Sequence, residues 1–199
     1  MKNTLLLLVY SSLIFASINP FISSESSSEK SSRLYEISPF GRYDTTIIHD
    51  KNKIITDEET SEPMLIGYCT REIFSDSSFA VWFNSAYEDY ISDSTSGSIL
   101  KEKMEDVDVT VIMGTWCDDS RIYIPYLYKI FDEINFPTGE INLIAVNREK
   151  KTEGDEIENL AIDLVPTIIF YKNNSEIGRI VESPQQSLEE DMLNILTSK

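Results

Sequence analysis

Hydrophobic and polar residues follow helix-like and strand-like patterns through most of the second half of the chain. Asp76 and Ser77 are suitable helix N-caps, and the aromatic residues after them recur at helical spacing. This stripe, which we expect to pack in a core, consists of Phe79, Phe83, Tyr87 and Tyr90. A weaker helical pattern, interrupted by Gly97, covers residues 94–104.

A strand-like segment then leads directly into a third helical pattern. Residues 107–113 are rich in valine and isoleucine, as in a buried strand, and Gly114 ends the segment. Residues 122–134 repeat apolar side chains at helical spacing. Cys117 therefore lies at the start of a helix, where free backbone N–H groups and the helix dipole favour a thiolate.

The N-terminal residues have the pattern of a targeting sequence. Lys2 precedes an apolar run over residues 5–16, which is shorter than the ~20 residues that a membrane-spanning helix needs. We interpret residues 1–22 as a signal peptide and expect an exported protein, in the periplasm, the extracellular space or the secretory pathway. No stable membrane insertion is expected after the signal is removed. An uncleaved anchor or a buried helix is the alternative.

The patterns divide the rest of the chain into three parts. Residues 23–62 combine a serine-rich linker with a poorly defined extension, in which Ile47–Ile48 and Ile54–Ile55 are short strand-like pairs. Residues 63–104 are expected to be a helical extension packed on the core. Residues 105–199 are expected to form the core domain.

Composition argues against several classes of function. The 199 residues include 34 Asp or Glu and 17 Lys or Arg, and the formal net charge of −17 argues against nucleic-acid binding. With one histidine and two cysteines we expect no metal site, and no cofactor is expected. The sequence has no Gly-x-Ser-x-Gly elbow and no phosphate-cradling glycine loop. His49 is therefore expected to be a plain surface residue.

The residues around the first helix turn after Gly114 resemble the thioredoxin family. Trp116-Cys117-x-x-Ser120 stands where the family has Trp-Cys-x-x-Cys, and Pro125 matches its helix-kinking proline. Val165-Pro166-Thr167 is similar to the family's cis-proline turn. Further strand and helix segments follow in the family's order, at residues 140–147, 156–162, 168–173, 177–181 and 187–196. The resemblance covers residues 105–199 and implies a thioredoxin-like α/β fold with a central mixed β-sheet flanked by helices.

The sequence departs from the family pattern at two positions. Ser120 replaces the second cysteine, so this motif cannot close a disulfide of its own. Val111 stands where thioredoxins usually bury an aspartate that transfers protons. Asp118 and Asp119 also differ from the Gly-Phe pair of single-cysteine glutaredoxins, so an iron–sulfur cluster held with glutathione is not expected. Neighbouring carboxylates also disfavour a thiolate at Cys117.

The resemblance implies two candidate functions. In the first, the protein has a thiol–disulfide redox role in which Cys117 forms mixed disulfides with polypeptide thiols or disulfides, and Ser120 hydrogen-bonds the sulfur. The substrate groove would be shaped by Trp116, Val165, Pro166 and Thr167. The alternative is a non-catalytic module that binds extended polypeptides, like a chaperone or the subunit of a complex. Whether the protein is an enzyme is left open.

Cys69 is the candidate resolving thiol. It is the only other cysteine, and oxidising compartments favour pairing, which makes a Cys69–Cys117 disulfide or exchange pair a hypothesis. The competing interpretation is that Cys69 is a small buried residue in an apolar segment.

Overall fold

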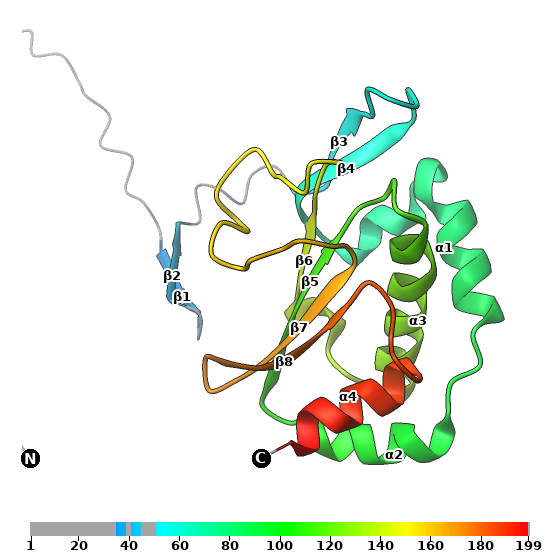
Figure 1. Ribbon diagram of the computed structural model, residues 1–199, viewed down its shortest axis with the longest axis vertical. Helices are drawn as coiled ribbons and strands as arrows, with labels where there is room; N and C mark the ends of the chain where they lie inside the picture. Colours follow the sequence, from blue (N-terminus) through cyan, green and yellow to red (C-terminus); the bar gives the residue numbers. More distant parts are fainter. Residues whose placement is uncertain (1–34, 39–40, 45–50, 199) are drawn as a thin grey trace, which may run out of the picture. The chain divides into compact units, whose positions relative to one another are not determined.

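A computed structural model describes residues 35–38, 41–44 and 51–198 (Figure 1). The expected signal peptide, the serine-rich tract, the Ile47–Ile48 pair and His49 lie outside the described residues. Strands β1 (Tyr35–Ser38) and β2 (Gly41–Asp44) pair antiparallel with each other in a two-stranded sheet.

One six-stranded mixed sheet organises residues 51–198, with strand order β3-β4-β6-β5-β7-β8 (Figure 1). Strands β5 and β6 pair parallel, and every other pair of neighbours is antiparallel. The strands are β3 (Lys53–Thr56), β4 (Pro63–Cys69), β5 (Val107–Met113), β6 (Ile141–Ala145), β7 (Thr167–Lys172) and β8 (Ser175–Val181). Together with the helices below, this sheet confirms the thioredoxin-like α/β fold class.

Residues 63–69, expected in a helical extension, instead form strand β4, so the expected boundary of the sheet domain is wrong. Strand β4 pairs antiparallel with β6, with Gly67 opposite Ala145, and with β3 on its other side. The segment buries three consecutive apolar residues, Met64, Leu65 and Ile66. Strand β4 has a paired strand on each edge, and a short continuous apolar run without helical periodicity is consistent with a strand that is buried on both faces.

The described residues contain four α-helices, three of them where the sequence patterns predict them and the last where the resemblance implied a closing helix. They are α1 (Ser77–Asp89), α2 (Ser94–Lys103), α3 (Asp118–Ile134) and α4 (Leu188–Thr197), and two short 3₁₀ turns are η2 (Arg71–Ser75) and η3 (Thr138–Glu140). Asp76 caps α1 by accepting a hydrogen bond from the Ser78 amide, and Ser187 caps α4 in the same way from the Glu190 amide. These side chains satisfy amides that have no partner inside the helix.

The helix that the resemblance implied over residues 156–162 is absent. Hydrogen-bonded turns occupy residues 155–160, with the Glu158 amide donating to the Asp155 carbonyl and the Leu160 amide to the Ile157 carbonyl. The like charges of Asp155 and Glu158 are three residues apart, which destabilises a helix, and Ala161 has a positive φ of 51°. A segment this short cannot offset those costs on its own.

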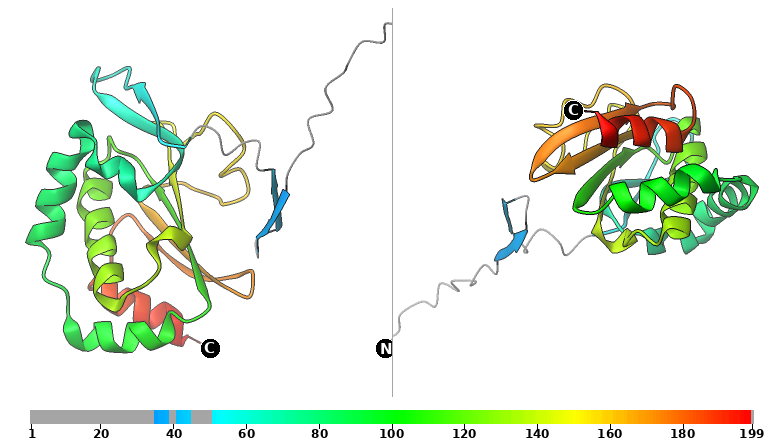
Figure 2. Two further views of the ribbon diagram at one scale, coloured as in Figure 1. Left: turned by 180° about the vertical axis from the view of Figure 1, so that it is seen from behind. Right: turned by 90° about the horizontal axis from the view of Figure 1, so that it is seen from below.

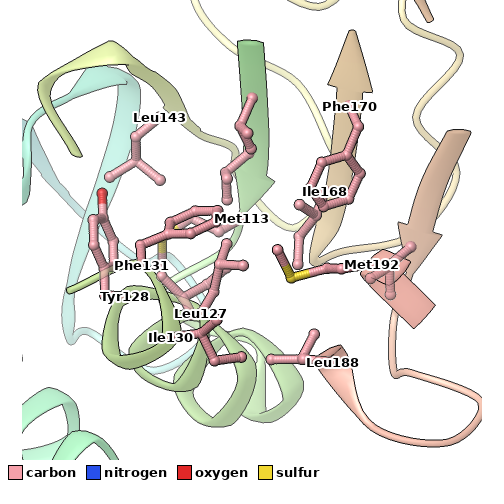
Figure 3. Packing of buried hydrophobic residues seen from close by; sticks show 14 of the residues in the cluster. Met113, Leu127, Tyr128, Ile130, Phe131, Leu143, Ile168, Phe170, Leu188 and Met192 are labelled. Atoms are coloured by element: carbon pink, nitrogen blue, oxygen red, sulfur yellow. The ribbon is translucent and has the colours of Figure 1, made fainter. Parts of the chain in front are cut away.

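The main core lies on one face of the sheet, and all four helices contribute to it (Figures 1 and 2). Figure 3 shows side chains of α3 and α4 meeting the strand residues Met113, Leu143, Ile168 and Phe170. A smaller cluster covers the opposite face and consists of Ile112, Val146, Val165 and Ile169. The clusters use alternate positions of β5, as the period of a strand requires. The site described next lies at the end of β5, where this smaller cluster begins.

Candidate functional site at Cys117

Cys117 occupies the N-cap position of α3, as the sequence predicts. Strand β5 ends at Met113 and α3 begins at Asp118, and the Cys117 amide donates to the Gly114 carbonyl at 2.9 Å across the turn between them. The Cys117 carbonyl accepts the Arg121 amide at 3.1 Å, which is the first hydrogen bond of the helix. The buried strand and the amphipathic helix thus fix the backbone of this residue on both sides.

The sulfur of Cys117 faces the turn around Pro166. Its Sγ lies 3.2 Å from the Val165 carbonyl oxygen and donates to it, although the two residues are 48 positions apart in the sequence. The Val165–Pro166 peptide bond is cis. The turn is held by the Thr167 hydroxyl, which donates to the Leu164 carbonyl at 2.7 Å, and by the Glu182 amide, which donates to the Pro166 carbonyl at 2.7 Å.

The groove residues named from the sequence thus meet at one place, with Cys117 half-buried between them. Trp116 and Cys117 pack against the cluster that contains Val165. Within residues 51–198 no acceptor lies in hydrogen-bonding position to the Val165 amide. An extended chain lying along this turn can accept from that amide, in the manner of strand addition.

Ser120 does not contact the sulfur in the way the sequence suggested. Its side chain is fully buried at 0% exposure, and its Oγ accepts a hydrogen bond from the Gly114 amide at 3.2 Å. Ser120 lies almost one helical turn after Cys117, and its side chain points into the protein next to Gly114, which follows β5. Cys117 Sγ instead faces Val165. The expected hydrogen bond between Ser120 and Cys117 is not among those made by the described residues. Ser120 instead stabilises the strand-to-helix turn.

Two carboxylates and one arginine follow Cys117 in the first turn of α3. Asp118 is exposed and Asp119 is half-buried, and neither forms an ion pair with any residue that the structure describes. Arg121 Nε donates to the Thr115 carbonyl at 2.6 Å, which ties the start of the helix back to the turn. With two carboxylates and one guanidinium, this first turn carries a net negative charge.

Arg148 and Asp57 are neighbours of the site that the sequence reasoning missed. The Arg148 guanidinium lies 5.4 Å from the Trp116 ring centroid. It also pairs with the Asp57 carboxylate, 91 residues earlier in the sequence, with Nη2 to Oδ2 at 2.7 Å. No local pattern indicates such a long-range pair.

Cys69 is a core residue, and both cysteines are free thiols in the structure. Cys69 is 6% exposed on β4 and belongs to the helix-side core, whereas Cys117 packs against the cluster on the opposite face. Burial raises the pKa of the Cys69 thiol to about 12. The disulfide hypothesised between the two cysteines is not formed, because the sheet lies between them.

Neither a metal-ligating cluster nor a membrane-crossing helix is found among the described residues. They contain no group of three or more His, Cys, Asp or Glu side chains placed to hold a metal ion. None of their helices is both long enough and apolar enough to cross a membrane.

The solved structures that resemble this chain do so at low sequence identity and with TM-scores below 0.5. No model of a known protein family matches it, and no curated protein does. A Pseudomonas aeruginosa protein of unknown function is 18% identical over 59% of this chain and 78% of its own, with a TM-score of 0.37. A Fasciola hepatica thioredoxin is 20% identical over 49% of this chain and 88% of its own, with a TM-score of 0.35. Mitochondrial thioredoxin 3 of Saccharomyces cerevisiae is 20% identical over 55% of this chain and 98% of its own, with a TM-score of 0.34. At these scores the matches carry no argument about activity, which rests on the geometry of the site.

Proposed function

We propose that this protein forms mixed disulfides with extended cysteine-containing segments of other polypeptides through Cys117. The observation that carries the proposal is the half-buried sulfur at the N-cap of α3, held 3.2 Å from the Val165 carbonyl beside Pro166. A nucleophilic sulfur at a helix start and a turn that can pair with an extended chain are two parts that thiol–disulfide exchange needs.

Thiol–disulfide exchange at Cys117 transfers electrons between sulfur atoms only, so it needs no cofactor. The Cys117 thiolate attacks one sulfur of a substrate disulfide, the substrate S–S bond breaks, and the other substrate sulfur leaves as a thiolate. The product is a mixed disulfide between Cys117 and the substrate. A second thiol then attacks this bond to release Cys117 and form a new disulfide.

The second thiol has to come from outside the chain. Ser120 has no sulfur, and Cys69 is buried on the other face of the sheet. Both facts support a mixed disulfide that persists until a small thiol or a partner thiol arrives. The exported location predicted from the N-terminal pattern would supply disulfide-bearing partners. Export of the protein is part of this proposal, and cell fractionation tests it by locating the protein.

Capture of partners from the native compartment tests the proposal. Wild-type protein is compared with Cys117→Ser, and Cys69→Ala is the matched control because it removes the other thiol. Wild type and Cys69→Ala are expected to retain the same partners until reductant is added, and Cys117→Ser is expected to lose them. Ser120→Cys adds a nearby thiol and is expected to lower the amount trapped.

The second candidate function is binding without chemistry. The Val165 amide, with no acceptor among residues 51–198, favours it, because pairing with an extended chain there needs no sulfur. In that case Cys117→Ser and wild type would capture identical partners with and without reductant. That result would reject the redox role and support the binding module.

A further inference from the structure

Arg148 connects the β3–β4 hairpin to the residue before the nucleophile. Its Nε lies 3.0 Å from both Asp57 carboxylate oxygens, and Nη2 lies 2.7 Å from Oδ2. Its Nη1 also reaches Glu59 at 3.3 Å. The same guanidinium lies 5.4 Å from the Trp116 ring centroid. A planar guanidinium held at two points by a carboxylate keeps one orientation, which a lysine ammonium would not.

Asp57 is a rigid anchor for this arginine. It is 3% exposed, directly after β3, and it also accepts hydrogen bonds from the Glu59 amide at 3.1 Å and the Thr60 hydroxyl at 2.9 Å. The hydrogen bond from Arg148 lowers the pKa of Asp57 to about 2, so the carboxylate is charged at neutral pH. These contacts restrict the Asp57 carboxylate independently of Arg148.

The Trp116 side chain contacts three neighbours, and Arg148 is one of them. Its Nε1 donates to the Val146 carbonyl at 2.9 Å. One part of the ring lies against Gly114, where an added Cβ would come within 2.6 Å of ring atoms. The Arg148 guanidinium approaches the ring as well. Trp116 and Cys117 pack against the same cluster, which includes Val165, so the ring lies near the turn that the sulfur faces.

We propose that Asp57 and Arg148 are positioning residues that hold the Trp116 ring as a wall of the groove and so orient an extended substrate at Cys117. The inference rests on the proposed exchange function, and it names two residues from distant parts of the chain that this function requires. Their role is to place the peptide, so a small reagent that needs no groove should not depend on them.

The test separates placement of a peptide from the reactivity of the thiol. All variants carry Trp82→Phe, which leaves Trp116 as the single tryptophan of a chain that has two. The peptide probe is an unstructured cysteine peptide joined by a disulfide to thionitrobenzoate, whose coloured thiolate leaves when Cys117 attacks the peptide sulfur. The small probe is iodoacetamide, and the position of the ring is followed by acrylamide quenching of Trp116 fluorescence.

Arg148→Ala and Asp57→Asn are expected to slow the peptide reaction about tenfold and to increase quenching. Alkylation by iodoacetamide should stay within about twofold, because the backbone that holds Cys117 is unchanged. Arg148→Lys should give intermediate rates. Arg179→Ala is the matched control, since Arg179 forms a similar two-point pair with Glu176 on β8, and it should change none of the three readouts.

The outcomes distinguish this inference from the function on which it rests. Unchanged quenching in Arg148→Ala, or peptide and iodoacetamide rates that change together, would overturn the positioning role. If the wild type reacts with iodoacetamide and not with the peptide disulfide, the proposed exchange function fails and the peptide-orienting role fails with it.

Discussion

The hydrogen bond between Tyr90 and Glu189 ties the helices before β5 to the last helix of the chain. Tyr90 is the C-cap of α1, and its hydroxyl donates to Glu189 Oε2 on α4 at 2.7 Å. Glu189 is 1% exposed, and its other oxygen accepts the Asp93 amide at 3.1 Å. Burial and the neighbouring carboxylate raise the pKa of Tyr90, so the hydroxyl remains a donor through the neutral range.

Replacing Tyr90 with phenylalanine removes this hydroxyl and keeps the ring, which stacks on Tyr126 at 4.1 Å. A hydrogen bond to a charged group contributes about 1.5–3 kcal/mol, and its loss leaves a buried carboxylate with a single donor. We therefore expect Tyr90→Phe to lower the free energy of unfolding by about 2 kcal/mol. For a chain of this size that corresponds to a fall in Tm of about 4–8 °C.

Urea unfolding followed by circular dichroism measures this change. Tyr123→Phe is the matched control, because no described residue hydrogen-bonds the Tyr123 hydroxyl, and it should change the free energy of unfolding by less than about 0.5 kcal/mol. The double variant with Tyr90→Phe and Glu189→Gln should lose less free energy of unfolding than the sum of the losses in the two single variants, since the two residues share one interaction. A Tyr90→Phe variant as stable as Tyr123→Phe would refute the reasoning.

Two further predictions concern the thiols and acid stability. Under native conditions an alkylating reagent should label Cys117 alone, because Cys69 is buried and burial raises the pKa of its thiol to about 12. Mass spectrometry of peptides should find Cys69 labelled only after unfolding. Labelling of both thiols in the native protein would contradict the core position of Cys69. Because Arg148 lowers the pKa of Asp57 in the folded protein from 3.8 to about 2, the stabilisation from this group is complete above the unfolded value and is lost as the pH falls toward 2. Between about pH 5 and pH 2, Asp57→Asn should thus lose less free energy of unfolding than wild type in urea titrations. An equal dependence of this free energy on pH in the two proteins would contradict the pairing of Asp57 with Arg148.

Local patterns were enough to predict the elements that present the nucleophile. The N-cap at Asp76, the strand over residues 107–113 and the helix after Cys117 all depend on residues within a few positions of each other. The position of Cys117 at a helix start follows from the same short-range patterns. These features could be read because hydrogen bonding and side-chain periodicity within one element determine them.

One incorrect expectation arose where a distant segment decides the outcome, and another came from the resemblance. Residues 63–69 carry no clear period, and only pairing with β6 makes them a strand. The turns at residues 155–160 replace a helix that the resemblance implied but that the local charges do not favour.

The sequence by itself determined that Cys117 stands at the start of a helix, and the resemblance implied a proline turn later in the chain. Only the tertiary structure decided that Cys117 Sγ faces Val165, that Ser120 turns inward, and that Cys69 lies on the other face of the sheet. The pair of Asp57 and Arg148 likewise exists only because β3 and the loop after β6 reach the same end of the sheet. The physical reason is that packing against segments many residues away sets the direction of a side chain at the end of a helix or strand. The local periodicity of the sequence contains no information about that packing.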